Sequence, residues 1–262
     1  MQKKLLVIPS LPTIIITTEQ IRQHTCNFNS DQDSVAADFA IAELFALPIT
    51  LQSHFNRVAL LDALFNTSLR RSKPRAGRER RSLVEISEAI RSQLPDLARL
   101  VESLRSNSLF ELDLSHPDVS HTISDCVKAL VQCLNNNSMS FAGKYLHFIF
   151  PSLFPPWDSL VLQAINTLSK QEIFPAKALK ASELDTPEWY LRLCEIYQGI
   201  YARLLPEDRI AIVQHDFSTQ PEEWRRTNTL VRIIDKSLWT KGKQARKQGG
   251  EQPAQATRNP RT

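Results

Sequence analysis

Apolar residues recur at three- and four-residue steps through most of this chain, and this period limits the possible folds more than any other sequence feature. In one clear example, Ile123, Cys126, Val127, Leu130 and Leu134 would lie on a single face of a helix. With 262 residues, the chain is long enough to bury a sizeable core. The sequence therefore predicts an all-α fold built from amphipathic helices.

Proline and capping residues indicate where the expected helices begin. Ser82 and Pro95 are predicted to start two successive helices, since proline is favoured in a first helical turn. Near the N-terminus, the short sequences LLVI and TIIITT have the β-branched content of strands, but two short strands do not form a domain core. Further segments with the helical period begin near Ser34, Ile49, Thr122, Phe141, Ser159, Thr186 and Thr227.

We expect residues 1–239 to form one mainly helical domain, in one or two lobes, with its catalytic core near residues 120–205. Residues 240–262 carry Gly, Gln, Lys and Arg without an apolar period, which predicts a disordered basic tail. No apolar run approaches the roughly 20 residues of a membrane span. The four cysteines lack the spacing of a zinc site and are expected to be reduced. These features favour a cytoplasmic protein without a cofactor.

Positive charge is concentrated in two segments of the chain. The net charge is +4, yet residues 70–81 hold seven basic residues and one acid, and residues 236–262 hold the same numbers, which leaves −8 on the rest. An acidic body with two basic segments indicates contact with a polyanion at defined places. A solvated loop and a solvated tail are the alternative. The residues of the first segment that would make this contact are Arg70, Arg71, Lys73, Arg75, Arg78, Arg80 and Arg81.

The stretch SFAGKYLHFIFPSLFPPWDS, residues 140–159, combines an aromatic helix with a rigid, proline-rich loop. Pro151 forbids continuation of the helix, and each later proline fixes its own backbone. Asp158 or Ser159 is expected to cap the following helix, where unpaired amides and the helix dipole favour a charged carboxylate. The stretch therefore predicts a fixed, ionised carboxylate beside bulky aromatic side chains.

This order of a helix with a lysine, a proline-containing loop and an aspartate at a helix start resembles the helix-hairpin-helix superfamily of DNA glycosylases. FPPWD takes the place of the family's loop, whereas the usual G-x-G of the hairpin is represented by Gly143 alone. The resemblance implies that Asp158 is the catalytic carboxylate and that Lys144 stands where bifunctional members keep their Schiff-base lysine. The residues nearest to them, and therefore the candidates for holding the substrate base, are Trp157, Tyr145, His147 and Phe154.

The implied reaction removes a modified base that has been flipped out of double-stranded DNA, leaving an abasic site. On this interpretation the basic residues of segment 70–81 are DNA-binding residues that contact phosphates. A carboxylate near the sugar C1′ would stabilise the oxocarbenium character of the transition state or activate water. The stretch that begins at Gly143, GKYLHF, and ends in WDS resembles a divergent bacterial branch of this superfamily, which includes phage-defence glycosylases that excise hypermodified cytosines. Glucosylated hydroxymethylcytosine in phage DNA is thus one expected target, in antiviral defence, and an alkylated or oxidised base in base-excision repair is another.

Two other functions stay open at this point. The R-x5-H spacing of Arg209 and His215 resembles the ribonuclease motif of HEPN-type helical toxins. A non-catalytic helical protein that binds nucleic acid through its basic segments is the second alternative. In that case Asp158 is only an N-cap, Lys144 only a phosphate contact, and Trp157 a plug in the core.

Overall fold

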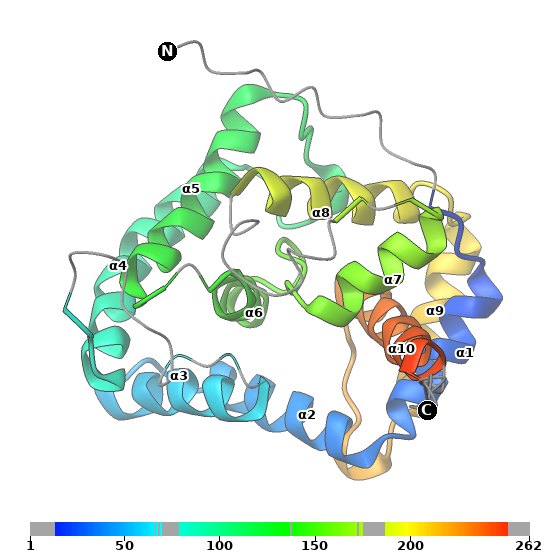
Figure 1. The fold of residues 1–262 in the computed structure, drawn as a ribbon, viewed down its shortest axis with the longest axis horizontal. Coiled ribbons are helices and arrows are strands. Elements are labelled where there is room, and N and C mark those ends of the chain that lie inside the picture. The colour runs from blue at the N-terminus through cyan, green and yellow to red at the C-terminus, as the bar shows by residue number, and fades with distance from the viewer. Residues whose placement is uncertain are drawn as a thin grey trace, which may run out of the picture.

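A nearly fully buried helix, α6 (Met139–Ile149), runs through the middle of the molecule. Figure 1 looks almost along its axis and shows the other helices arranged around it. Its sequence is apolar on most of its circumference, and a helix of that kind is stable only when neighbours cover all of its faces. The burial of Lys144 and His147 follows from this position, because both belong to the central helix.

The computed structural model describes residues 14–65, 67, 69, 79–136, 138–171, 173–174 and 187–250. Every regular element in these ranges is a helix, so the predicted all-α fold is confirmed. One cluster of buried apolar side chains, drawn from residues 14 to 238, forms the core. The α-helices are α1 (Thr18–Asn29), α2 (Gln32–Ala46), α3 (Leu51–Phe65), α4 (Leu83–Ser103), α5 (Pro117–Cys133), α6, α7 (Ser159–Ser169), α8 (Pro187–Tyr201), α9 (Pro206–Thr219) and α10 (Leu230–Gly250), with 3₁₀ turns η1 (Leu109–Glu111) and η3 (Glu222–Trp224).

Side-chain caps fix several helix starts, and the sequence predicts two of them, at Ser82 and Asp158. Ser82 forms a capping box with Glu85 at the start of α4, and Ser138 caps α6. Asp158 caps α7, as expected, and accepts a hydrogen bond from the amide of Leu160. These caps satisfy amides that have no partner inside their helix. Within the ranges that the structure covers, no helix combines the length and the apolar character needed to cross a bilayer.

The prediction that a second helix starts at Pro95 is wrong, because α4 continues through it. Proline inside a helix leaves the carbonyl four residues earlier, here that of Arg91, without its usual partner. Pro95 and Arg91 are both exposed, so water can hydrogen-bond this carbonyl. Burial of Ile86, Ile90 and Leu97 on one face holds the two halves in line.

The extended segment before α1, residues 14–17, pairs with no strand among the described residues. Ile14 and Ile16 are buried and Ile15 is exposed, an alternation typical of extended chain. The carbonyl of Ile14 accepts a hydrogen bond from Arg203 instead of pairing with a second strand. A capping box between Thr17 and Gln20 then starts α1, a helix that the period of the sequence did not predict. The sequence LLVI lies outside the described residues.

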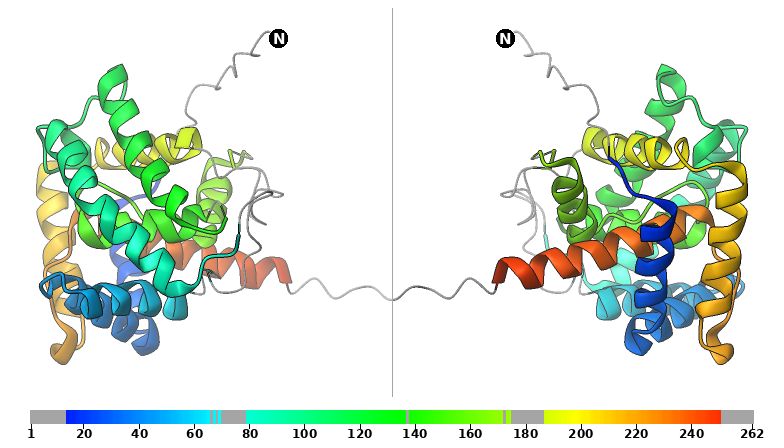
Figure 2. Two further views of the ribbon diagram at one scale, coloured as in Figure 1. Left: turned by 90° about the vertical axis from the view of Figure 1, so that its left-hand side faces the viewer. Right: turned by 90° about the vertical axis from the view of Figure 1, so that its right-hand side faces the viewer.

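Helix α10 continues to Gly250, so the prediction of a disordered tail is wrong for residues 240–250. Polar contacts take the place of an apolar period: Thr240 donates to the carbonyl of His24, and the ammonium of Lys243 lies 2.6 Å from a carboxylate oxygen of Asp31. The C-terminal turns of α10 project from one side of the molecule (Figure 2). Residues 251–262 lie outside the described ranges.

Two glycines let α6 and α10 approach the start of α7 very closely. A Cβ atom on Gly242 would lie 2.0 Å from the carbonyl oxygen of Leu160, in the first turn of α7. A Cβ atom on Gly143 would lie 2.9 Å from the backbone nitrogen of Trp157, next to Asp158. The N-terminus of α7 is therefore held between α6 and α10, at distances that only glycine permits.

We predict that Gly242→Ala destabilises the protein by about 1–3 kcal/mol or more, because the added methyl group meets backbone atoms that cannot move aside. Gly199→Ala is the matched control, since nothing lies within 4 Å of its Cβ position in α8. That change should stabilise the protein by about 0.5–1 kcal/mol. Urea unfolding followed by circular dichroism measures both effects. Equal midpoints for the two variants would contradict the close packing of α10 on α7.

Candidate functional site

A cavity of about 420 Å³ lies where α10, α6 and the start of α7 meet helices α1, α2 and α3. Its volume falls in the range of about 300–1,000 Å³ that is typical of ligand pockets. Its aromatic walls are Phe28, Phe65, Phe148 and Trp239, and its polar groups are Lys144, His147, Asp158, Arg232 and Asp235. Three of the predicted site residues, Asp158, Lys144 and His147, thus share one cavity.

Asp158 presents a fixed carboxylate to this cavity. Oδ1 accepts a hydrogen bond of 2.9 Å from the amide of Leu160, and Oδ2 lies 2.9 Å from the Nζ atom of Lys144. The side chain of Asp158 is 20% exposed, whereas that of Lys144 is only 5% exposed. The ammonium group is therefore enclosed by protein, and the carboxylate is the member of the pair that a ligand can reach.

Lys144 directs all three of its N–H bonds to protein acceptors. Besides Asp158, Nζ donates to the hydroxyl of Ser140 at 2.8 Å and to the carbonyl of Trp157 at 3.2 Å. An ammonium group has three donors and no acceptor, so this set uses its full capacity. The ring of Phe65 lies over the same group, with its centroid 5.5 Å from Nζ. These contacts fix the ammonium group of Lys144 in place, so that it orients the carboxylate of Asp158.

The pKa of Asp158 is lowered by this arrangement. Burial disfavours the charged carboxylate, but the ammonium of Lys144 and the hydrogen bonds from Lys144 and Leu160 outweigh the burial. The positive charge of Arg246 on α10 acts in the same direction. Asp158 is consequently ionised at neutral pH, as the sequence predicts for an aspartate at a helix start.

A second carboxylate, Asp235 on α10, lines the same cavity in a contrasting environment. Asp235 is almost fully buried, and it contacts Arg232 and accepts a hydrogen bond from the hydroxyl of Tyr197. Burial, together with the negative charges of Asp158 and Asp38, raises its pKa to about 6 against the opposing effect of Arg232. Two carboxylates of different proton affinity therefore face one cavity.

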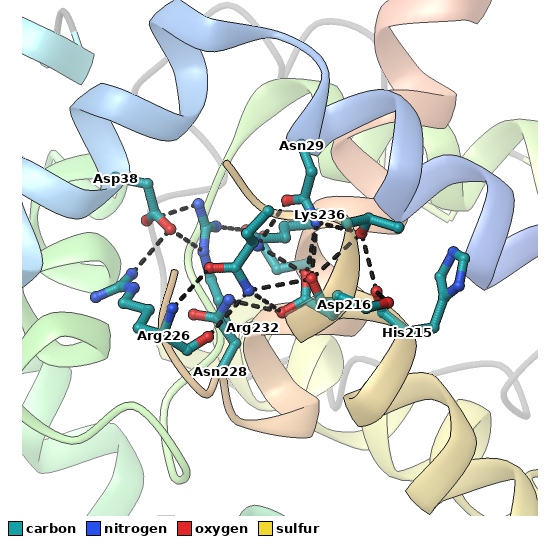
Figure 3. A network of polar contacts seen from close by, with 12 residues as sticks. Asn29, Asp38, His215, Asp216, Arg226, Asn228, Arg232 and Lys236 are labelled. Atoms are coloured by element: carbon teal, nitrogen blue, oxygen red, sulfur yellow. Dashed lines mark hydrogen bonds and ion pairs between the residues drawn. The ribbon is translucent and has the colours of Figure 1, made fainter. Parts of the chain in front are cut away.

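A buried polar network fixes α10 and thereby the position of Asp235. Arg232 forms an ion pair of 2.8 Å with Asp38 on α2, and Arg226 contacts the same carboxylate at 2.8 Å. One turn further along α10, Lys236 lies 2.8 Å from Asp216 on α9. Figure 3 shows these contacts, which extend from α2 to α9 through α10. A buried charge network of this kind is costly to disturb, because each member would be left unpaired in the interior.

His147 is neutral and firmly held at the cavity wall. Its Nδ1 atom lies 2.9 Å from the carbonyl of Phe154, so this nitrogen carries the proton and donates it. Burial and the positive charge of Arg232 lower the pKa of His147 to about 3. The other ring nitrogen, Nε2, is then the hydrogen-bond acceptor of the ring.

The predicted aromatic walls of the site are largely wrong. Trp157 packs between Phe174 and Tyr190 in the core, and only its carbonyl contributes to the site. Tyr145 is fully buried, with its hydroxyl 3.2 Å from Nδ1 of His54, and Phe154 is fully buried beside Tyr190. Aromatic residues that lie near Asp158 and Lys144 in sequence can point into the core, and these three do.

The cavity instead takes its aromatic walls from α1, α3, α6 and α10, at Phe28, Phe65, Phe148 and Trp239. Arg232, Asp235 and Trp239 were also missed by sequence reasoning. Their spacing of three and four residues places them on one face of a single helix, and this pattern is the signal that was available.

The basic segment at 70–81 lies mostly outside the described residues, including Arg70, Arg71, Lys73, Arg75 and Arg78. Arg80 is exposed, as a DNA contact requires. The guanidinium of Arg81 instead donates to the carbonyls of Gln132 and Cys133 at the end of α5. Near the cavity, α10 carries the exposed Arg246 and Lys247 on its projecting turns.

The residues of the ribonuclease alternative make separate structural contacts. Arg209 stacks on the ring of Tyr201, 3.8 Å from its centroid, and donates to the hydroxyl of the same residue. His215 lies 3.2 Å from the carbonyl of Arg22 on α1. Neither side chain lines the cavity that contains Asp158.

Comparison with known proteins does not assign this chain to a family. No family model matches it, and neither the curated proteins nor the solved structures include a significant match. Among the described residues, no group of three or more His, Cys, Asp or Glu side chains is arranged to hold a metal ion. The geometry of the cavity is therefore the basis for assigning a function.

We predict that Lys144→Met raises the pKa of Asp158, because the variant removes the adjacent positive charge and keeps the burial. An NMR titration of the side-chain carboxyl carbon of Asp158 measures this pKa. Lys128→Met is the control, since Lys128 forms an exposed pair with Asp125 on α5. An unchanged pKa in the Lys144→Met protein would show that the ion pair does not hold Asp158 in its charged form.

Proposed function

We propose that this protein is a DNA glycosylase, which hydrolyses the N-glycosidic bond of a modified nucleotide flipped out of the double helix. The observation that supports this most strongly is the ionised carboxylate of Asp158, held by Lys144 at the wall of an aromatic cavity of about 420 Å³. The resemblance of residues 140–159 to the helix-hairpin-helix glycosylases gives the same role to the same aspartate.

The reaction needs a negative charge at a fixed place. As the base departs, the sugar develops oxocarbenium character, and a preorganised carboxylate near C1′ stabilises that charge or accepts a proton from the attacking water. Asp158 suits this role because a backbone amide and the ammonium of Lys144 fix its two oxygens. Both groups favour the ionised carboxylate, and the side chain of Asp158 is 20% exposed.

The flipped base needs a flat apolar slot with a few polar groups. Phe28, Phe65, Phe148 and Trp239 offer faces on which a base can stack. His147 and Asp235 offer hydrogen-bonding groups for its edge. The exposed Arg246 and Lys247 on α10 would contact phosphates of the duplex, and Arg80 would extend this contact.

The target base is a modified one on this proposal, and glucosylated hydroxymethylcytosine in phage DNA is the first to test. Cleavage of such DNA would serve antiviral defence, whereas release of an alkylated or oxidised base would serve base-excision repair. The ribonuclease alternative is less well supported, because the side chains of Arg209 and His215 contact Tyr201 and α1 rather than a shared cavity.

The central test compares the wild type with Asp158→Asn on duplexes that carry one modified base and on matched unmodified duplexes. Abasic sites are measured with an aldehyde-reactive probe. We expect the wild type to release a modified base. The rate of the variant should be at least about 10²-fold lower, which is the usual size of a general-base or electrostatic contribution. DNA binding should persist, because the phosphate contacts are unchanged.

Asp125→Asn is the matched control. Asp125 also forms an ion pair with a lysine, but that pair is exposed, whereas the pair of Asp158 is buried. The Asp125→Asn variant should keep full activity. Equal activity in the wild type and in Asp158→Asn would contradict the catalytic role of Asp158. No base release from any duplex by the wild type would contradict the proposed function.

The contacts of Lys144 lead to a separate prediction about the product. A Schiff base requires that the amine nitrogen reach C1′ of the sugar, but Nζ of Lys144 is held by Ser140, Trp157 and Asp158. We therefore expect the wild type to leave the DNA strand intact at an abasic site and to form no covalent complex with abasic DNA on treatment with borohydride. A trapped complex that is lost in Lys144→Met would contradict this prediction.

A further inference from the structure

Asp235 is a carboxylate in the cavity wall that the role of Asp158 leaves unused. It lies on α10, whereas Asp158 lies at the start of α7 and is held by Lys144 of α6. The two carboxylates thus reach one cavity from different helices. We propose that Asp235 is the general acid of the reaction, and that it donates a proton to the departing base. This inference rests on the proposed glycosylase function.

Hydrolysis of an N-glycosidic bond is accelerated by a general acid. A neutral base leaves poorly as an anion, and protonation at a ring nitrogen or an exocyclic oxygen makes it a better leaving group. The carboxyl proton of Asp235 passes to the base, and the bond between C1′ and the base nitrogen breaks with its electron pair going to the base. Water then forms the new bond to C1′, and its proton passes to the carboxylate of Asp158. Both carboxyl groups regain their starting states by proton exchange with solvent.

The surroundings of the two carboxylates separate their roles. Asp158 has the ammonium of Lys144 at 2.9 Å and is 20% exposed, whereas the side chain of Asp235 is 4% exposed. Burial raises the pKa of Asp235 to about 6, and the charge on Asp158 acts in the same direction. Two carboxyl groups whose environments push their pKa values apart are the arrangement expected of an acid and a base that share one site.

Arg232 contacts Asp235 but does not hold it fully ionised, because the guanidinium is shared. Its Nη2 atom lies 2.8 Å from Asp38 on α2, so Asp235 competes with Asp38 for one positive charge. Arg226 also neutralises Asp38. The titratable and charged groups that act on Asp235 from the helices around it are Arg232, Asp38, Lys144, Asp158, Tyr190 and Tyr197.

The pH dependence of base release tests this assignment, using the modified duplex on which the wild type is active. The wild type should show a bell-shaped profile: the rate rises as Asp158 ionises and falls as the pH passes about 6 and Asp235 loses its proton. In Asp235→Asn the rate at the optimum should be about 10²–10⁴-fold lower, and the fall on the basic side should disappear. Asp125→Asn should keep the profile of the wild type.

A second variant tests the assignment in case Asp235→Asn does not fold. The hydroxyl of Tyr197 donates a hydrogen bond of 3.3 Å to Oδ1 of Asp235, which favours the ionised carboxylate. Tyr197→Phe removes that bond and should move the basic side of the profile to higher pH. The role of Asp235 is overturned if the fall in rate at high pH stays at the same pH in Tyr197→Phe. It is also overturned if this fall persists in a folded Asp235→Asn protein.

These outcomes are distinct from a failure of the proposed function. If the wild type releases no base from any duplex, the glycosylase proposal fails, and the role of Asp235 fails with it. If the wild type is active and Asp235→Asn has the same rate and profile, the proposed function stands and only the role of Asp235 is wrong.

Discussion

The ion pair between Lys144 and Asp158 is the interaction on which the rest of the site depends. An ammonium group with 5% exposure is costly to bury, and only three well-placed acceptors make its position stable. The same contacts fix the carboxylate and keep it charged at the wall of the cavity. One buried charge thus determines both the geometry and the protonation state of its partner.

The backbone supports this pair through two close approaches. Gly143 brings the loop at Trp157 onto α6, and Gly242 brings α10 onto the first turn of α7. Together they place the capped end of α7 between the central helix and the helix that carries Asp235. Ion pairs from α10 to Asp38 and Asp216 then prevent rotation of α10, which would move Asp235 away from the cavity. The site is therefore built on rigid elements rather than on a flexible loop.

The sequence predicts the helices well and the walls of the site poorly, for physical reasons. The helical period and the local caps depend on residues that are neighbours in the chain. Ser82 and Asp158 could therefore be predicted as helix caps from the sequence alone. Which way Trp157 points depends on the packing of distant helices, and the chain turns it into the core. The order of α10 beyond Thr240 likewise depends on tertiary contacts, among them the approach at Gly242.

We propose that the carboxylate of Asp158 faces a sugar that becomes positively charged as its base departs. A crystal structure of the protein bound to duplex DNA with one cationic pyrrolidine in place of a deoxyribose tests this most directly. We predict that the pyrrolidine lies in the cavity, with its charged nitrogen within hydrogen-bonding distance of Asp158 and with the Lys144 contact retained. DNA bound elsewhere, with Asp158 contacting only Lys144 and Leu160, would contradict the account.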